Sequence, residues 1–292
     1  MRRALLLYNP LAGDQGTAGK LDYITGRFQD RGILLQPYRL TFQGSEQLPG
    51  LLASGEFEQV VVSGGDGTVN FVSNILMRNK LDMPVGIIPA GTCNDFARSL
   101  KIPGSLEDCI EIVLEGKVRC VDVGLINERD YFIGTLAGGF FVDVSYSTHH
   151  ELKRNFGPFA YYLKALTEVA NIKGFNIKLT ADGETVEEKI LLFVVLNGKD
   201  VGGFTNVIKE ADVSDGLMDI LLVKECSHID LGALFFKVLS PDSLEDRNVI
   251  KLKARKCTVE GDEGIATSVD GEKGPSLPMT ISFINKALKV FV

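Results

Sequence analysis

Three short apolar runs in the first third of the chain are each followed by a glycine-containing turn and then by a helical pattern. The runs span residues 4–8, 59–62 and 85–88, and the turns read NPLAG, SGGDGT and PAGTCNDF. Nearly continuous apolar strands that alternate with helices are typical of a parallel sheet covered on both faces. In such a sheet ligands bind beyond the carboxyl ends of the strands. The sequence therefore predicts an α/β domain over residues 1–121, with all three turns at its ligand-binding edge.

The second turn is the richest of the three in glycine. Gly64, Gly65 and Gly67 let the backbone approach a ligand closely, since a Cβ would obstruct it. The start of the following helix offers free N–H groups and a positive end, which favour phosphate. The turn is neither a P-loop nor the dinucleotide fingerprint, because Asn70 stands where the last glycine of that fingerprint would fall. A tight strand-to-helix connection without a ligand is the alternative, but three such turns on one edge favour a nucleotide.

Polar residues in the turns indicate where the helices begin and where a cation would bind. Thr68 can cap the helix after the second turn, and Asn94 or Asp95 can cap the helix after the third. Asp66 lies beside the expected phosphate site, where an acidic side chain is costly unless a cation sits between it and the phosphate. The sequence therefore predicts a divalent cation together with the nucleotide.

Beyond about residue 121 the pattern changes to short strands with tight turns. Alternation over residues 177–181 leads to Asp182-Gly183, a hairpin signal, and the apolar run 190–196 follows as the partner strand. One amphipathic helix is expected over residues 158–169. These features predict a mainly-β second domain over residues 122–292. Its other expected strands span residues 216–223, 249–259, 266–269, 280–283 and 288–292.

Composition argues against several classes of protein. The net charge of -7 argues against nucleic acid as a partner, because phosphate binding depends on a basic surface. The five cysteines form no C-x-x-C pair, so neither a disulfide framework nor a zinc site is indicated, and a reducing cytoplasm fits. The longest nearly uncharged apolar window falls well below the roughly 20 residues that a membrane-spanning helix needs. We therefore expect a soluble, cytoplasmic protein.

Taken together, the motifs NPLAG, SGGDGTVN and IPAGTCNDFAR resemble the catalytic domain of the diacylglycerol kinase family, which includes sphingosine and ceramide kinases. The resemblance continues through VDVG at 121–124, GPFAYYLKAL at 157–166, SDGLMDI at 214–220 and VDGE at 269–272. It covers nearly the whole chain and is closest to the soluble bacterial type. The family is similar in architecture to NAD kinases and phosphofructokinases. The resemblance thus implies a two-domain protein, with a Rossmann-like α/β nucleotide-binding domain and a β-sandwich, and with ATP between them.

The resemblance also implies which residues bind ATP and Mg²⁺. Asp66, Asn94, Asp95 and Asp122 would organise the phosphates, the magnesium ion and its waters. ATP itself would contact the three turns and one further loop. The residues carried over for ATP are Asn9, Pro10, Gly13, Thr41, Gly64, Gly65, Asp66, Gly67, Thr68, Asn70, Thr92 and Asn94.

A second, structural metal site is implied at the SDGL segment. There Asp215 would supply a carboxylate, while Asp212 and Leu217 would offer backbone carbonyls. A set of oxygen ligands suits Mg²⁺. Read without the family, SDGL is a plain Asp-Gly turn before a strand.

The VDGE segment supplies two candidates for the group that accepts the proton of the acceptor hydroxyl. Phosphoryl transfer needs in-line positioning, neutralisation of the γ-phosphate and such a base. An ordinary aspartate is already ionised at neutral pH and can accept a proton late in the transfer. Of the two candidates we prefer Asp270, with Glu272 close behind. Read alone, VDGE is a hairpin turn, and only the resemblance brings it to ATP.

A lipid substrate would require contact with a membrane surface. In VIKLKARK, residues Lys251, Lys253 and Arg255 are expected on one strand face. The segment 149–159 adds further cations and phenylalanines, and GTLAGGFFV is a candidate lining for an acyl chain or simply core. Each cation near an anionic membrane contributes about 1 kcal/mol, which would allow peripheral association. Protection of an edge strand explains the lysines equally well.

These features predict a kinase that transfers the γ-phosphate of ATP to diacylglycerol, another long-chain alcohol or a prenol. A kinase of the NAD kinase-like superfamily with a soluble substrate is the main alternative. A nucleotide-binding regulator is a second alternative, but it would have no need for Asp270. An exposed β-rich domain also makes a homodimer plausible.

Overall fold

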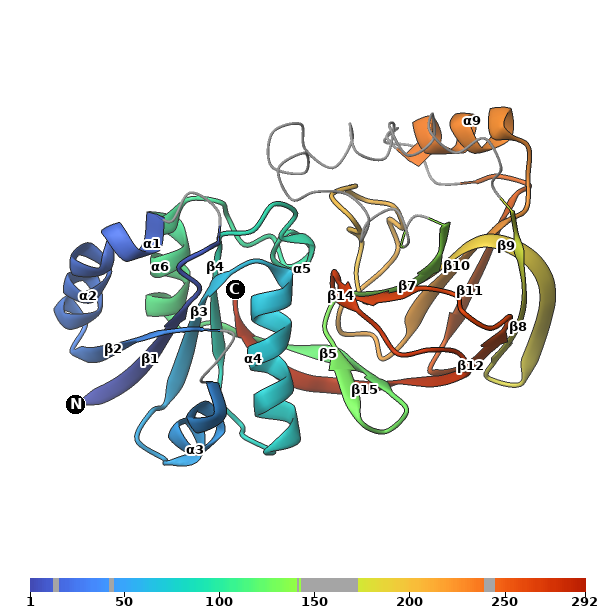
Figure 1. Ribbon diagram of the computed structural model, residues 1–292. Helices are drawn as coiled ribbons and strands as arrows, with labels where there is room; N and C mark the ends of the chain where they lie inside the picture. The colour runs from blue at the N-terminus through green and yellow to red at the C-terminus, as the bar shows by residue number, and fades with distance from the viewer. Residues whose placement is uncertain (13–15, 42–44, 141, 143–172, 239–244) are drawn as a thin grey trace. The chain divides into compact units, whose positions relative to one another are not determined.

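The computed structural model describes residues 1–12, 16–41, 45–140, 142, 173–238 and 245–292 (Figure 1). The chain forms two compact units. The first contains Met1–Val121 together with Lys286–Val292, and the second contains Asp122–Asn285. The expected helix over 158–169, the motif at 157–166 and the basic segment 149–159 lie outside the described residues.

A parallel sheet forms the centre of the first unit, in the order β4-β3-β1-β2. The sheet forms because its strands are almost purely apolar. Ala4, Leu5, Leu6 and Leu7 are fully buried in the first strand. The expected α/β fold is therefore confirmed. The strands are β1 (Arg2–Tyr8), β2 (Ile33–Arg39), β3 (Gln59–Gly64) and β4 (Val85–Pro89).

Helices cover both faces of this sheet. α2 and α6 contact each other, and α3 contacts α4, which packs on β3 (Figure 1). The ends of α6 are set by its caps: the Ser105 side chain accepts a hydrogen bond from the Asp108 N–H at the start, and Gly116 ends the helix with a positive φ. The helical segments are α1 (Gly16–Gly19), α2 (Leu21–Asp30), η1 (Ser45–Gln47), α3 (Leu48–Ala53), α4 (Asp66–Arg78), α5 (Asp95–Ser99) and α6 (Leu106–Glu115).

The second unit is mainly β, as expected, and its strands pair antiparallel in the order β14-β13-β7-β9-β8-β12-β15. β10 lies between β9 and β11, and β5 pairs with β6. The strands are β5 (Val118–Ile126), β6 (Asp130–Phe132), β7 (Thr135–Gly139), β8 (Phe175–Ala181), β9 (Glu184–Leu196), β10 (Met218–Lys224), β11 (Val249–Ala254), β12 (Lys256–Gly261), β13 (Thr267–Val269), β14 (Glu272–Lys273) and β15 (Met279–Phe291).

Two apolar clusters stabilise this unit. One contains Phe132 and Phe193, and the other contains Val194 and Leu234. β9 contributes side chains to both clusters, which explains why its second half is continuously apolar rather than alternating. The hairpin predicted at Asp182-Gly183 is confirmed, since both residues have positive φ between β8 and β9.

Three details of the expected strands are wrong. Residues 249–259 form two strands rather than one, because Asp182 accepts hydrogen bonds from the N–H groups of Arg255 and Lys256 and turns the chain there. Residues 280–283 and 288–292 belong to one strand, β15. The strand expected from residue 216 begins at Met218, because residues 214–217 form the SDGL turn.

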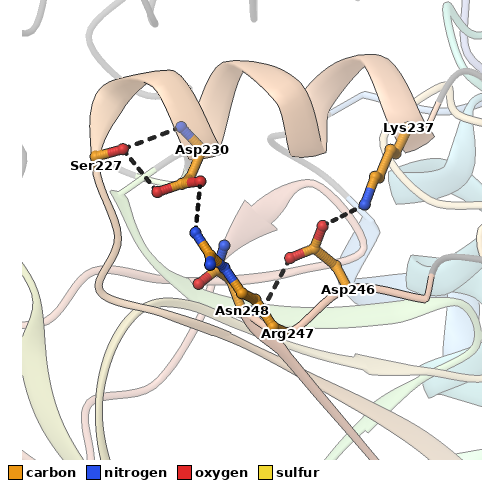
Figure 2. Close-up of polar contacts among 6 residues, drawn as sticks. All are labelled: Ser227, Asp230, Lys237, Asp246, Arg247 and Asn248. Carbon is orange, nitrogen blue, oxygen red and sulfur yellow. Dashed lines mark hydrogen bonds and ion pairs between the residues drawn. The ribbon is translucent and has the colours of Figure 1, made fainter.

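Helix α9 (His228–Val238) was not expected from the sequence. Its Ser227 hydroxyl donates to Asp230 Oδ2 at 2.7 Å and accepts from the Asp230 N–H at 3.1 Å (Figure 2). Ion pairs from Asp230 to Arg247 and from Lys237 to Asp246 tie the helix to the segment before β11 (Figure 2). The Ser-x-x-Asp pattern is a helix-start signal that would have revealed it. The exposed apolar residues Ile229 and Phe236 interrupt the amphipathic pattern of α9, which made the helix hard to recognise from the sequence.

Candidate active site

The strand order of the first unit reverses at β1. From β1 the chain first adds β2 on one side, and it then adds β3 and β4 on the other side. Ligands of open α/β sheets bind outside the carboxyl ends of the strands at such a reversal. Because the first and second glycine turns follow β1 and β3 directly, the topology puts both turns at this position.

Asn9 holds the first turn against the second. Its Oδ1 accepts a hydrogen bond from the Leu11 N–H at 2.9 Å, and its own N–H donates to the Ser63 carbonyl at 3.0 Å. Its Nδ2 lies 3.5 Å from Thr68 Oγ1. The hydroxyls of Ser63 and Thr17 are 2.6 Å apart, a contact that the motif comparison did not predict. The first two turns are therefore joined by side-chain as well as backbone contacts.

Three other residues, Pro10, Gly13 and Thr41, were predicted to contact ATP. Pro10 follows Asn9 in the turn and is half-buried. Gly13 lies outside the described residues. Thr41 is exposed, and its carbonyl accepts a hydrogen bond from the Ser45 hydroxyl at 2.9 Å. The structure leaves the roles of all three as predictions.

The second turn leads into α4 three residues earlier than expected. α4 begins at Asp66 with Gly65 at the N-cap position, so the expectation that Thr68 caps the helix is wrong. Thr68 lies in the first helical turn and its N–H donates to the Gly65 carbonyl at 2.9 Å. A Cβ on Gly64 would lie 2.4 Å from the Thr68 Cβ, so Gly64 lets this side chain pack against the turn.

The second and third turns approach each other through their glycines. A Cβ on Gly91 would lie 2.5 Å from the Gly65 Cα, and a Cβ on Gly65 would lie 3.0 Å from the Gly91 Cα. Real Cβ atoms essentially never come as close as 2.5 Å to a backbone atom, and 3.0 Å is tighter than most real Cβ contacts. Gly91 was not among the predicted site residues, although it belongs to the quoted motif. The two glycines allow the turns after β3 and β4 to share one edge.

Asp66 reinforces this contact, because its Oδ1 accepts a hydrogen bond from the Phe96 N–H in α5 at 3.2 Å. Asn94 occupies the N-cap position of α5, but its side chain does not cap the helix. Its amide instead bonds to the N–H and the carbonyl of Gly91, at 2.8 and 2.9 Å. Asp95, the first residue of α5, forms an ion pair with Arg98. The two helix starts therefore lie beside acidic and amide groups.

The three remaining predicted ATP residues differ in their surroundings. Asn70 is half-buried, and its Oδ1 accepts a hydrogen bond from the Asn74 side chain at 2.9 Å. Thr92 is exposed in the third turn. Gly67 lies in the first turn of α4, beside Asp66.

Asp122 belongs to the second unit and is fully buried. Its Oδ2 accepts a hydrogen bond from the Gly216 N–H at 2.6 Å, and its Oδ1 accepts one from Asn285 Nδ2 at 2.9 Å. Its own N–H donates to the Val213 carbonyl at 2.7 Å. These contacts give Asp122 a role in holding the SDGL turn, which the sequence reasoning did not foresee.

The SDGL turn brings several acidic residues near one lysine. Asp212 Oδ1 accepts hydrogen bonds from Ser214, and Asp215 Oδ1 accepts one from the Leu217 N–H at 2.9 Å. Lys253 Nζ lies 2.9 Å from Asp215 Oδ2. A magnesium ion at Asp215 would therefore have to share this carboxylate with the Lys253 ammonium group, and the metal site stays a prediction.

Asp219 lies next to this cluster and is buried. Its Oδ1 is 3.9 Å from Lys253 Nζ, and Lys253 stands directly opposite it on β11. Burial raises the pKa of Asp219 to about 6, because desolvation outweighs the stabilising charge of Lys253. Among the described residues, no group of three or more His, Cys, Asp or Glu side chains is arranged to hold a metal ion.

Asp270 lies in a two-residue hairpin turn between β13 and β14, where Asp270 and Gly271 have φ values of 47° and 86°. Its carboxylate accepts hydrogen bonds from three consecutive backbone N–H groups. Oδ2 accepts from Ile133 at 2.8 Å, and Oδ1 accepts from Gly134 at 2.9 Å and Thr135 at 2.7 Å. Only 6% of Asp270 is exposed. VDGE is thus a hairpin turn whose aspartate is firmly oriented.

Glu272 differs from Asp270 in its surroundings, since it is exposed on β14. Asp66 belongs to the first unit, whereas Asp270 belongs to the second. Their action on one nucleotide therefore stays a prediction.

The expected basic face of residues 249–259 is only partly formed. Lys251 and Lys253 lie on β11, but Arg255 falls between two strands, so the expectation of three cations on one strand face is wrong. Lys251 pairs with Glu245 at 3.0 Å and Lys253 with Asp215, which neutralises both lysines locally. No helix among the described residues has the length and apolar character to cross a membrane.

Comparison with known proteins identifies the family. Residues 3–126 match the model of the diacylglycerol kinase catalytic domain, and residues 137–292 match that of the YegS C-terminal NAD kinase beta sandwich-like domain. The chain is 30% identical to the diacylglycerol kinase of Staphylococcus carnosus (strain TM300), covering 99% of this chain and 95% of that protein. It is also 30% identical to the diacylglycerol kinase of Staphylococcus aureus (strain MRSA252), with 99% and 92% covered.

A solved structure agrees with these matches. The crystal structure of a diacylglycerol kinase from Bacillus anthracis str. Sterne superposes with a TM-score of 0.83 at 26% identity, covering 99% of this chain and 96% of that one. Both the α/β domain and the β-sandwich-like domain therefore have counterparts in known kinases. The chain belongs to the diacylglycerol kinase family and is a kinase with an alcohol acceptor.

Proposed function

We propose that this protein is an ATP-dependent lipid kinase that phosphorylates the hydroxyl of diacylglycerol or a related membrane lipid. The curated relatives from both Staphylococcus species carry the name of that activity over nearly the full length of the chain. The observation that carries the proposal for this chain is the Asp270 carboxylate, which three backbone N–H groups orient inside a buried hairpin turn. A base must be held in a defined orientation to accept a proton during transfer.

The glycine turns of the first unit fit the phosphates of ATP. A 13-residue helix, α4, begins directly after Gly65, and the first N–H groups of a helix have no partner within it. Gly65 and Gly91 lie close to each other, and neither has a Cβ that would cover its backbone. We propose that ATP phosphates bind along these turns, with Asn9, Thr68 and Asn94 fixing the turns to one another.

Magnesium is the cation that a kinase of this family implies. Mg²⁺ in such sites is held by one or two carboxylates together with the substrate phosphates, rather than by a protein cage. The residues of the first unit fit this pattern, because Asp66 and Asp95 stand at the starts of two helices. When bound, the ion would neutralise charge on the transferred phosphate. We propose Asp66 and Asp95 as its protein ligands.

In the proposed reaction, the lipid hydroxyl oxygen attacks the γ-phosphorus while the bond from that phosphorus to the β-phosphate oxygen breaks. The products are the lipid phosphate and ADP. Asp270 accepts the hydroxyl proton late in this transfer. Glu272 is the alternative base, but its exposed position offers no comparable orientation.

The substitution Asp270→Asn tests the role of the base. It keeps the shape of the side chain but removes the group that accepts the proton, so we expect kcat to fall by about 10² to 10⁴ while KM for ATP changes by no more than a few fold. Initial rates with purified protein and γ-labelled ATP measure this. Glu272→Gln is the matched variant, and kcat should stay near wild type. Normal turnover by Asp270→Asn would eliminate Asp270 as the base.

The acceptor is tested in parallel with the wild-type chain. Labelled ATP is supplied with vesicles that contain diacylglycerol, a long-chain alcohol or a prenol, and separately with NAD or a sugar phosphate. Label in the lipid phase supports the proposal and identifies the alcohol. Label confined to a water-soluble product would replace it with a kinase of soluble substrates. Flotation of the same vesicles at low and high salt shows whether the chain associates with their surface.

A further inference from the structure

The backbone of Ile133, Gly134 and Thr135, called here the 133–135 segment, lies between two polar residues that are distant in sequence. On one side are the carboxylate and the N–H of Asp270. On the other side is Asn197, which directly follows the last residue of β9. This position is set by strand register, since Thr135 pairs with Leu196 and Val269 pairs with Leu136. The residues after β9 and β13 are therefore brought to opposite edges of the same short segment.

Every backbone hydrogen-bonding group of the segment has a partner from one of these two residues. The three N–H groups donate to the Asp270 carboxylate, and the Thr135 carbonyl accepts from the Asp270 N–H at 2.8 Å. The Ile133 carbonyl accepts from Asn197 Nδ2 at 2.9 Å, and the Gly134 carbonyl accepts from the Asn197 N–H at 2.8 Å. Because a peptide unit is planar, the orientation of the Gly134 and Thr135 N–H groups depends on the two carbonyls that Asn197 holds.

The same amide nitrogen makes a second contact. Asn197 Nδ2 donates to the backbone carbonyl of Asp122 at 2.7 Å. Both partners of Nδ2 are carbonyl oxygens, which only accept, so the amide must face them with its nitrogen. Asp122 in turn holds Gly216 and Asn285 through its carboxylate. Asn197 therefore connects the buried Asp122 network with the segment that orients Asp270.

The oxygen of this amide, Asn197 Oδ1, accepts no hydrogen bond from the residues that the structure describes. Asn197 is 2% exposed, and its Oδ1 has no hydrogen-bond partner among the residues that the structure describes. A buried acceptor without a partner is unfavourable, and native proteins rarely keep one without a reason. The contribution of this amide therefore lies in the two hydrogen bonds that its Nδ2 donates, to the carbonyls of Asp122 and Ile133.

We infer that Asn197 is a positioning residue for phosphoryl transfer, which holds the 133–135 segment so that its N–H groups orient the Asp270 carboxylate. The inference rests on the proposed function of Asp270, and it assigns Asn197 no contact with the reacting atoms. A small displacement of a reacting group can cost about 10² in rate. Loss of the two donor bonds should therefore lower kcat without comparable change in KM for ATP.

Asn197→Asp and Asn127→Asp form a matched pair of variants in the second unit. Both make the same change in charge and size. Asn127 is exposed and uses its Oδ1 to accept from the Thr280 N–H at 2.9 Å, and an aspartate can keep that bond. At Asn197 the change sets a carboxylate oxygen against two carbonyl oxygens. We expect kcat to fall about 10²-fold in Asn197→Asp and to stay near wild type in Asn127→Asp.

The pH profile separates positioning from a general loss of structure. A protonated aspartic acid at position 197 can donate one hydrogen bond, so the ratio of kcat in Asn197→Asp to kcat in wild type should rise as pH falls. Each rate is divided by the folded fraction at that pH, measured by circular dichroism. A corrected kcat equal to wild type, or a loss that is the same at every pH, would overturn the inference. If Asn197→Asp does not fold, Asn197→Ala is measured instead, and a corrected kcat equal to wild type in that variant would overturn the inference.

Hydrogen exchange gives a readout that needs no turnover and so separates this inference from the proposed function. Amide exchange of Gly134 and Thr135 should be faster in Asn197→Asp than in Asn127→Asp, because the segment that binds Asp270 is released. Unchanged exchange at these two amides would contradict the positioning role even if activity fell. Faster exchange combined with normal kcat would overturn the positioning role of Asn197 in catalysis, whereas normal turnover by Asp270→Asn would overturn the proposed base itself.

Discussion

Gly134 shows how the absence of one methyl group positions a carboxylate. A Cβ at this residue would lie 2.9 Å from Asp270 Oδ1, which is the oxygen that its own N–H binds. Any side chain would push the carboxylate away from the N–H groups of the 133–135 segment. The sequence showed Asp270 as a candidate base but gave no reason to single out Gly134 or Asn197. Both act through residues more than 60 positions away, so only the folded chain reveals them.

The substitution Gly134→Ala is expected to lower kcat by about 10², because the added Cβ displaces the Asp270 carboxylate. Initial-rate measurements and a melting curve check this. Gly232→Ala in α9 is the control, since a Cβ there meets nothing within 4 Å. In a helix interior that change should stabilise the protein by about 0.5–1 kcal/mol. Equal activity of both variants would show that Asp270 does not depend on Gly134.

At the level of elements, β10 and β11 show why the charges of this domain could not be read from the sequence. Alternation along residues 249–254 correctly places Lys251 and Lys253 on one face. It cannot show that Lys253 stands opposite Asp219 and reaches Asp215, because strand pairing brings those residues together. The hairpin at Asp182-Gly183 was predictable, since its turn chemistry is local.

Asp219 should make the stability of this strand pair depend on pH. Its pKa is raised to about 6, so between about pH 4 and pH 6 the folded state keeps a proton that the unfolded chain has released. The contribution of Asp219 to the unfolding free energy therefore falls as pH rises through this window. Asp219→Asn should gain stability relative to wild type by no more than about 3 kcal/mol at pH 7, and nothing at pH 3.

Denaturant unfolding at several pH values measures this difference. Asp230→Asn provides a contrast of opposite sign, because hydrogen bonding to Ser227 lowers the pKa of Asp230. Its carboxylate contributes stability that is present above the ordinary aspartate pKa and is lost as pH falls. The Asp230→Asn variant should thus lose stability relative to wild type as pH rises. A pH-independent difference for Asp219→Asn would contradict a raised pKa.

On the scale of the whole molecule, the chain does not divide at a single point. It leaves the first unit at Val121, and its last seven residues, Lys286–Val292, return to that unit. There Val290 pairs in parallel with Val85 of β4, and the Val292 N–H donates to the Lys117 carbonyl at 3.0 Å. Val290 and Phe291 are buried in the first unit as a result. The composition change near residue 121 was visible in the sequence, but the return of the C-terminus was not.

Phe291→Ala should therefore destabilise the first unit, although Phe291 stands at the opposite end of the chain. Removing a buried phenylalanine side chain typically costs about 3–5 kcal/mol. Lys289→Ala is the control, because it breaks only an exposed ion pair with Asp82 and should cost under about 1 kcal/mol. Thermal and denaturant unfolding of both variants measure the two costs. Similar stability of the two variants would show that the C-terminal residues do not stabilise the fold.

The sequence by itself determined the α/β class of the first unit, the mainly-β class of the second, the family and the candidate phosphate turns. The two fold classes and the phosphate turns depend on periodicity and turn chemistry within a few consecutive residues, whereas the family depends on the resemblance of motifs along the chain. Only the tertiary structure decided that Gly65 touches Gly91, that Asp122 holds the SDGL turn, and that Asn197 and Asp270 bind the same segment. Those contacts join residues far apart in the chain, and strand register, which is set by packing of the whole unit, brings them together.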